Sequence, residues 1–144
     1  MRILMVGPFP EDPDRVVGGV EAAAYAIARA LSEHEDVEKV LAVDLRTSAT
    51  PGRVYSDKLE ARFAKVPFIN GDALVRSWFA VNALRGIAKA FRPDVVHGQG
   101  IGRPGDIATQ LGLPAVVTVH GMVHLEARVT EQNLFSRLKA AALD

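Results

Sequence analysis

Apolar residues gather in short runs along this chain, and stretches with helical spacing separate these runs. The runs are near-continuous and rich in valine, which is typical of strands that are buried on both faces of a sheet. Four of them lie at residues 2–7, 37–45, 93–98 and 114–121. Residues 59–66 alternate between apolar and charged positions, and this pattern predicts another strand, third along the chain and at a sheet edge, which Pro67 limits.

Between the strands, apolar residues recur every three or four positions and predict helices that pack one face on the sheet. The first such stripe comprises Val20, Ala24, Ile27 and Leu31. A second runs over residues 74–91 and places Trp78 and Phe79 in the core. It follows a capping turn at residues 70–72 and ends before Pro93, because the residue that precedes a proline avoids the helical region. Shorter helices are predicted at residues 104–111 and 130–143, and a loop at residues 46–52.

This alternation predicts an α/β fold, a Rossmann-like doubly wound parallel sheet with helices on both faces and strand order 3-2-1-4-5. Ligands of such sheets bind at the carboxyl ends of the strands, where the winding direction reverses. The strands predicted here end at Gly7, at His97 and Gly98, and at His120 and Gly121. We therefore expect these ends and the glycine pair at residues 18–19 to converge on one crevice.

Composition narrows the class of protein. A chain of 144 residues is one domain or less, and its 17 basic and 17 acidic side chains leave no net charge, which argues against nucleic acid as the partner. No apolar run approaches the roughly 20 residues of a membrane span, and neither a signal peptide nor a basic amphipathic membrane signal is evident. Cysteine is absent, which excludes thiolate chemistry and disulfides and favours a cytoplasmic protein.

Gly18 and Gly19 stand between a predicted strand and a predicted helix, after a loop rich in proline and aspartate. Backbone N–H groups and the positive end of a helix dipole converge on an anion in this geometry, so the pair indicates a phosphate site, although two glycines also make a tight turn. Glu21 either accepts a hydrogen bond from a substrate hydroxyl or simply complements the helix dipole. The chain lacks both G-x-G-x-x-G and G-x-x-x-x-G-K-[ST], which disfavours a nucleotide-dependent oxidoreductase and a P-loop protein.

Two histidines end predicted strands. His120 follows an abrupt change from apolar to polar residues, and it either binds a hydroxyl or phosphate oxygen or caps the strand; His97 repeats the pattern. Arg15 and Arg103 lie in loops beside the expected crevice, where each either reaches an anion or is solvated. The spacing of His120 and His124 suits a metal pair only on a helix, so we expect no metal site.

Four segments together resemble one family. Residues 2–10, 18–21, 92–97 and 117–121 are similar, in this order, to the N-terminal half of GT-B glycosyltransferases of the large retaining family 4. The resemblance implies two Rossmann-like domains that face a cleft, the first binding the acceptor and the second holding most of the sugar nucleotide. It implies that Gly18 and Gly19 meet the donor's diphosphate, that Glu21 is the acidic residue of this motif, and that His120 lies beside the donor sugar.

The same resemblance implies transfer of a sugar, of the hexosyltransferase type and with retention, from a nucleoside diphosphate to an acceptor that the sequence does not identify, without metal or other cofactor. The family's two glutamates eight positions apart belong to the second domain and do not occur here. We therefore expect residues 1–144 to be a truncated first domain, inactive without the missing C-terminal, donor-binding domain. The alternative is a non-catalytic Rossmann-like module that binds a phosphorylated ligand.

Overall fold

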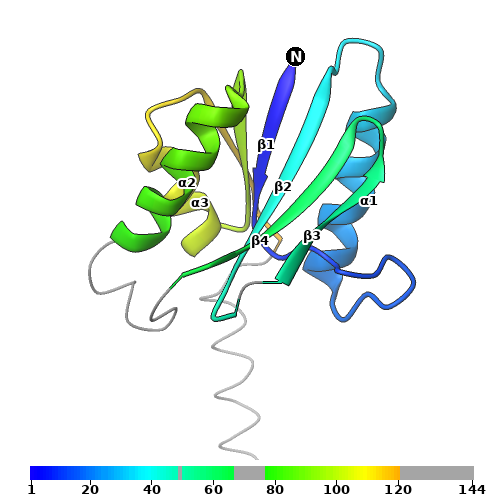
Figure 1. Ribbon diagram of the computed structural model, residues 1–144, viewed down its shortest axis with the longest axis horizontal. Helices are drawn as coiled ribbons and strands as arrows, with labels where there is room; N and C mark the ends of the chain where they lie inside the picture. The colour runs from blue at the N-terminus through cyan, green and yellow to red at the C-terminus, as the bar shows by residue number, and fades with distance from the viewer. Residues whose placement is uncertain (49, 67–76, 121–144) are drawn as a thin grey trace, which may run out of the picture.

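A six-stranded sheet with helices on both faces forms the described part of the protein (Figure 1). The structure is a computed structural model, and it describes residues 1–48, 50–66 and 77–120. The elements are β1 (Arg2–Val6), α1 (Gly19–Glu33), β2 (Lys39–Arg46), β3 (Thr50–Ser56), β4 (Leu59–Lys65), α2 (Trp78–Phe91), β5 (Val95–Gln99), α3 (Arg103–Gln110) and β6 (Ala115–Thr118). Among these described helices, none is long and apolar enough to cross a membrane.

The sheet order is β3-β4-β2-β1-β5-β6, and all neighbouring strands are parallel except β3 and β4. Leu4 in the central strand β1 is paired with Leu41 of β2 on one side and with Val96 of β5 on the other. The five predicted strands therefore occur in the predicted order. The Rossmann-like class is confirmed, and one additional strand extends the sheet.

That additional strand, β3, corrects two predictions. Residues 50–52 belong to β3 rather than to a loop, and β3 rather than β4 forms the sheet edge. Pro51 is tolerated because an edge strand does not need every N–H for pairing. Gly52 is required there, since a Cβ atom at this position would lie 2.8 Å from the carbonyl oxygen of Ala61 in β4. The sequence does not predict this strand, because its residues are mostly exposed and show no apolar alternation.

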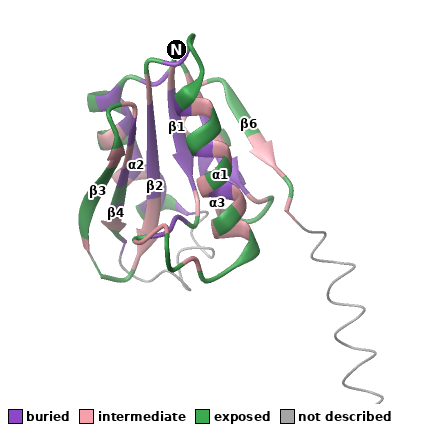
Figure 2. Cartoon of the chain, turned by 90° about the vertical axis from the view of Figure 1, so that its right-hand side faces the viewer, coloured by how far each residue is buried: buried purple, intermediate pink, exposed green. Residues whose placement is uncertain are grey.

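Alternate residues of the central strands enter two separate cores. Leu4 and Leu41 face α2 and α3 in one core, whereas Ile3 and Ala42 face α1 in the other. Figure 2 shows burial along β1 and the first part of β2, in contrast to the edge strands, of which β3 is mostly exposed and β6 is exposed or half-buried. Burial on both faces explains why these strands read as uninterrupted apolar runs.

Helix α1 lies against the sheet through smaller residues than the sequence predicts. Its fully buried positions are Ala24, Ala28 and Ser32, while Ile27 and Leu31 are only partly buried. The Ser32 hydroxyl donates a hydrogen bond to the carbonyl oxygen of Arg29 at 2.8 Å, which satisfies this buried polar group. Small side chains let the helix backbone approach the sheet closely.

Helix α2 shows that one core assignment was wrong. Trp78 and Phe79 are 57% and 39% exposed, and their rings contact each other edge to face with centroids 5.0 Å apart. The buried face of α2 comprises Ala80, Val81, Leu84, Ala88 and Phe91. The helix ends at Phe91, as predicted before Pro93, with Arg92 in the left-handed conformation at φ 52°. The predicted turn at residues 70–72 and helix at residues 130–143 lie outside the described residues.

Candidate functional site

The carboxyl ends of the parallel strands and the start of α3 surround a pocket of about 210 Å³. Gly7, which follows β1, lines this pocket together with Asp44 of β2 and Arg103 of α3. Its remaining walls are apolar apart from backbone groups and comprise Val6, Pro8, Leu45, Pro104 and Ile107. The structure thus places Arg103, alone among the predicted arginines, beside the ends of both central strands.

The glycine pair stands at the start of α1, where Gly18 is the N-cap residue and Gly19 the first helical residue. Gly18 has φ −172°, an extended conformation that any residue adopts. A Cβ atom built on Gly18 or Gly19 meets nothing within 4 Å in the described part of the chain. Neither the backbone conformation nor the packing therefore requires glycine at these two positions.

Glu21 makes a local hydrogen bond in this structure. Its Oε2 atom accepts the backbone N–H of Val17 at 2.9 Å, which closes the preceding loop onto the first turn of α1. This bond and the helix dipole both favour a carboxylate here. The geometry therefore gives Glu21 a structural role at the glycine pair.

The loop at residues 8–17 is held by residues of β2 that the sequence analysis did not single out. The guanidinium of Arg46 donates to Oδ2 of Asp44 at 2.9 Å and to the carbonyl oxygen of Phe9 at 3.1 Å, and it pairs with Glu11. The same Asp44 oxygen accepts the N–H of Phe9 at 3.4 Å. Burial raises the pKa of Asp44, Arg46 opposes this shift, and the negative charge of Glu21 adds a smaller rise.

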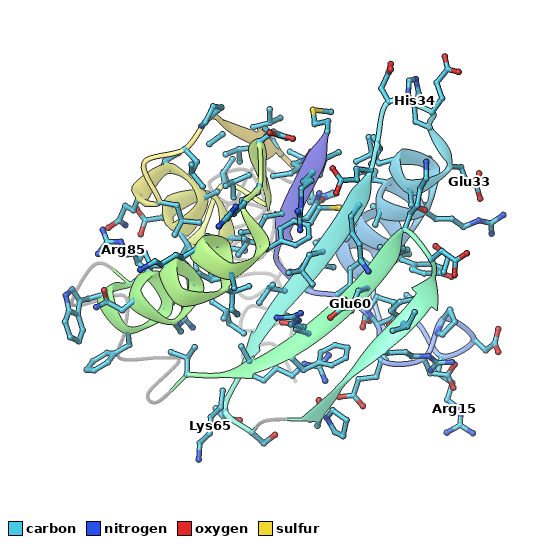
Figure 3. The ribbon with its side chains drawn as sticks, turned by 45° about the horizontal axis from the view of Figure 1, so that its top comes forward. Arg15, Glu33, His34, Glu60, Lys65 and Arg85 are labelled. Atoms are coloured by element: carbon cyan, nitrogen blue, oxygen red, sulfur yellow. The ribbon has the colours of Figure 1, made fainter. Side chains whose placement is uncertain are left out.

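Strand β3 fixes the same loop from its other side. Arg53 donates to the carbonyl oxygen of Glu11 at 2.6 Å, and the Tyr55 hydroxyl donates to the carbonyl oxygen of Pro10. The Phe9 ring packs edge to face against Tyr55 at 5.6 Å. Arg15, in contrast, is exposed, and Figure 3 shows it at the periphery, pointing away from the sheet. The strand missed by the sequence analysis thus anchors the loop that leads to the glycine pair.

A buried glutamine joins the two predicted histidines. Oε1 of Gln99 lies 2.7 Å from Nε2 of His120, and Nε2 of Gln99 lies 3.2 Å from Nε2 of His97. His97 Nε2 also lies 2.6 Å from the hydroxyl oxygen of Thr118. Gln99 is 2% exposed. The only sequence signal for it was a polar residue between two glycines at a strand end.

Burial lowers the pKa of His97 below its ordinary value of 6.5, and the positive charge of a protonated His120 lowers it further. The unfolded chain therefore binds more protons than the folded chain as the pH falls through 6.5. This contribution to stability is complete above that pH and is lost progressively below it.

We expect the wild type to lose stability relative to a His97→Asn variant as the pH falls from about 7 to about 5. Asparagine keeps a hydrogen-bonding side chain but does not titrate, and Asp44 is common to both proteins. Urea unfolding across this range measures the difference, and parallel pH profiles would show that His97 titrates normally in the folded protein.

Within residues 1–48, 50–66 and 77–120, no group of three or more His, Cys, Asp or Glu side chains is arranged to hold a metal ion. The model of Glycosyltransferase Family 4 matches residues 17–143, which is most of the chain and includes the glycine pair, Gln99 and both histidines of the network. No curated protein shows significant similarity to the chain.

Proposed function

The chain belongs to glycosyltransferase family 4, and on this premise we propose that it is the acceptor-side domain of a retaining enzyme. Such an enzyme moves a hexose from a nucleoside-diphosphate sugar to an acceptor. A second Rossmann-like domain would hold most of the donor. The observation that carries this proposal is the glycine pair, because a diphosphate explains two glycines that packing among the described residues does not require.

The chemistry of the pair suits a leaving diphosphate. The N–H groups in the first turn of a helix have no partners within the helix, and the helix dipole places partial positive charge on them. A phosphate approaches these groups closely where no Cβ atom stands in front of them. Fixed dipoles of this kind stabilise the negative charge that develops on the diphosphate as the glycosidic bond breaks, without a metal ion.

The other residues complete this proposal. Arg103 lines the pocket and supplies a positive charge beside it. Glu21 accepts a hydrogen bond from a substrate hydroxyl or holds the loop through the N–H of Val17. His120 lies next to the donor sugar. Gln99 contacts His120 through its amide oxygen and His97 through its amide nitrogen. Arg15, which extends to solvent, would meet a ligand only at the rim of the site.

Substituting Gly19 with valine is expected to weaken binding of inorganic pyrophosphate by about tenfold or more, because the new side chain occupies the space that the anion must enter. The fold should be retained, since this space is open. Titration with pyrophosphate, followed through the amide resonances of Gly18 and Gly19, measures the change.

Gly86→Val is the matched control, since a Cβ atom on Gly86 also meets no described residue within 4 Å but Gly86 lies on α2. It should leave pyrophosphate affinity unchanged. Equal affinity of Gly19→Val and wild type would remove the glycine pair from the site.

A further inference from the structure

We propose that Gln99 is a positioning residue that holds the uncharged ring of His120 in the Nε2–H tautomer and turns Nδ1 toward a ligand hydroxyl. The part of this inference that concerns the ligand rests on the proposed function. The part that concerns the tautomer rests on three neighbouring side chains alone.

The first step is the hydrogen bond between Gln99 and His120. The amide oxygen of Gln99 lies 2.7 Å from Nε2 of His120, a full-strength hydrogen-bond distance. An amide oxygen only accepts, so the proton of this bond belongs to His120 Nε2. An uncharged imidazole carries one N–H, which leaves Nδ1 as a hydrogen-bond acceptor.

The orientation of the Gln99 amide follows from its contact with His97. The amide nitrogen lies 3.4 Å from Nδ1 and 3.2 Å from Nε2 of that ring. A nitrogen nearly equidistant from both ring nitrogens lies over the ring face, because in the ring plane it would collide with the carbon between them. The face of an aromatic ring is negative, so it attracts an N–H and repels a carbonyl oxygen. His97 therefore directs the oxygen of Gln99 toward His120.

The backbone fixes Gln99 in this place. A Cβ atom on Gly7 would lie 2.7 Å from Cβ of Gln99, so the end of β1 presses directly against it. On its C-terminal side Gly100 adopts φ +113°, and its N–H donates to the carbonyl oxygen of Thr118 at 2.8 Å. Thr118 also holds His97 through its hydroxyl at 2.6 Å. Neighbouring elements thus restrict both the backbone and the side chain of Gln99.

This tautomer decides which partner His120 selects. Within the described residues, no hydrogen bond to Nδ1 of His120 is present, and the lone pair at Nδ1 can accept a hydrogen bond from a hydroxyl group. The same lone pair repels the oxygen of a fully ionised phosphate, which has no hydrogen to donate. We therefore assign His120 to a sugar hydroxyl rather than to the diphosphate.

The test of the tautomer is a nitrogen-15 spectrum of the imidazole side chains of the full chain at a pH where the rings are uncharged. The wild type is expected to show His120 protonated at Nε2 and unprotonated at Nδ1. Gln99→Met, which keeps the length of the side chain but removes both polar atoms, should produce a mixture of tautomers. Gln99→Glu, which keeps an acceptor, should restore the Nε2–H form.

His34, whose Nδ1 accepts the N–H of Asp36 at 3.2 Å, serves as the internal reference for an Nε2–H ring in these spectra. A His120 ring protonated at Nδ1 in the wild type would overturn the assignment whether or not the variants fold. A folded Gln99→Met variant with an unchanged His120 spectrum would overturn the role of Gln99.

The ligand is tested with UDP-glucose and UDP as probes. The His120 Nδ1 resonance should move on addition of UDP-glucose and stay in place with UDP, while the Gly18 and Gly19 amide resonances move with both. Equal movement of Nδ1 with UDP would overturn the assignment to a hydroxyl. No movement of the glycine amides with either probe or with pyrophosphate would count against the proposed function, and the tautomer would still be decided by the first experiment.

Discussion

Replacing Phe9 with alanine is expected to lower the free energy of unfolding by about 3–5 kcal/mol. Phe9 is 1% exposed although it lies in a loop. Its ring contacts Tyr25 of α1 at 5.9 Å and Tyr55 of β3 at 5.6 Å, so it joins the helix and the hairpin to the end of β1. Removing the ring leaves a cavity that two large aromatic neighbours cannot fill without moving.

The same substitution should also weaken pyrophosphate binding, because Phe9 anchors the loop that leads to Gly18 and Gly19. Chemical denaturation measures the stability, and a pyrophosphate titration at a temperature where the variant is folded measures the binding. Val17→Ala is the matched control in the same loop, since Val17 is 89% exposed and its truncation should change stability by less than about 0.5 kcal/mol. Similar losses in the two variants would contradict the anchoring role of Phe9.

Replacing Gly7 with alanine is expected to cost about 3 kcal/mol of stability through two separate effects. Gly7 adopts φ +149°, a conformation that side chains rarely allow, and its new Cβ atom would meet Cβ of Gln99 at 2.7 Å. Because the contact is with Gln99, we also expect the His120 imidazole spectrum to change. Thermal and chemical unfolding measure the stability, and the nitrogen-15 spectrum measures the effect on the site.

Gly102→Ala provides the comparison, since Gly102 follows the neighbouring strand β5 and a Cβ atom there meets nothing within 4 Å among the described residues. This variant should stay within about 1 kcal/mol of the wild type. A stable Gly7→Ala variant with the wild-type His120 spectrum would show that β1 does not hold Gln99 in place.

The buried strands could be predicted from the sequence, because each central strand is apolar on both faces. Together with the alternation at residues 59–66 and the helical spacing between the strands, this pattern predicts five strands and three helices within the described residues, and the doubly wound topology predicts the strand order. The exposed parts of the fold could not be predicted in this way. Strand β3 has little burial to produce a pattern, and Trp78 and Phe79 continue an apolar stripe although both are exposed.

The candidate site could be predicted from the sequence only in part, because its contacts join residues that are far apart in the chain. Gly18, Gly19 and Glu21 form a local motif at a helix start and were found in the sequence. Gln99 has no such signature, since His120 and Thr118 lie about twenty positions away and become neighbours only when β5 and β6 pair. The bonds from Arg46 and Tyr55 to the loop at residues 8–17 span 35 or more positions.

The central claim is that this chain is one half of a two-domain glycosyltransferase. Calorimetric titration tests it most directly, with UDP-, GDP- and ADP-sugars added to the 144-residue chain and to a longer chain that carries a second Rossmann-like domain. We expect tight binding and sugar transfer by the longer chain only, and loss of both in its Gly19→Val variant. Tight binding of a nucleotide sugar by the 144-residue chain itself, with no transfer by either protein, would contradict the claim and establish a self-sufficient binding module.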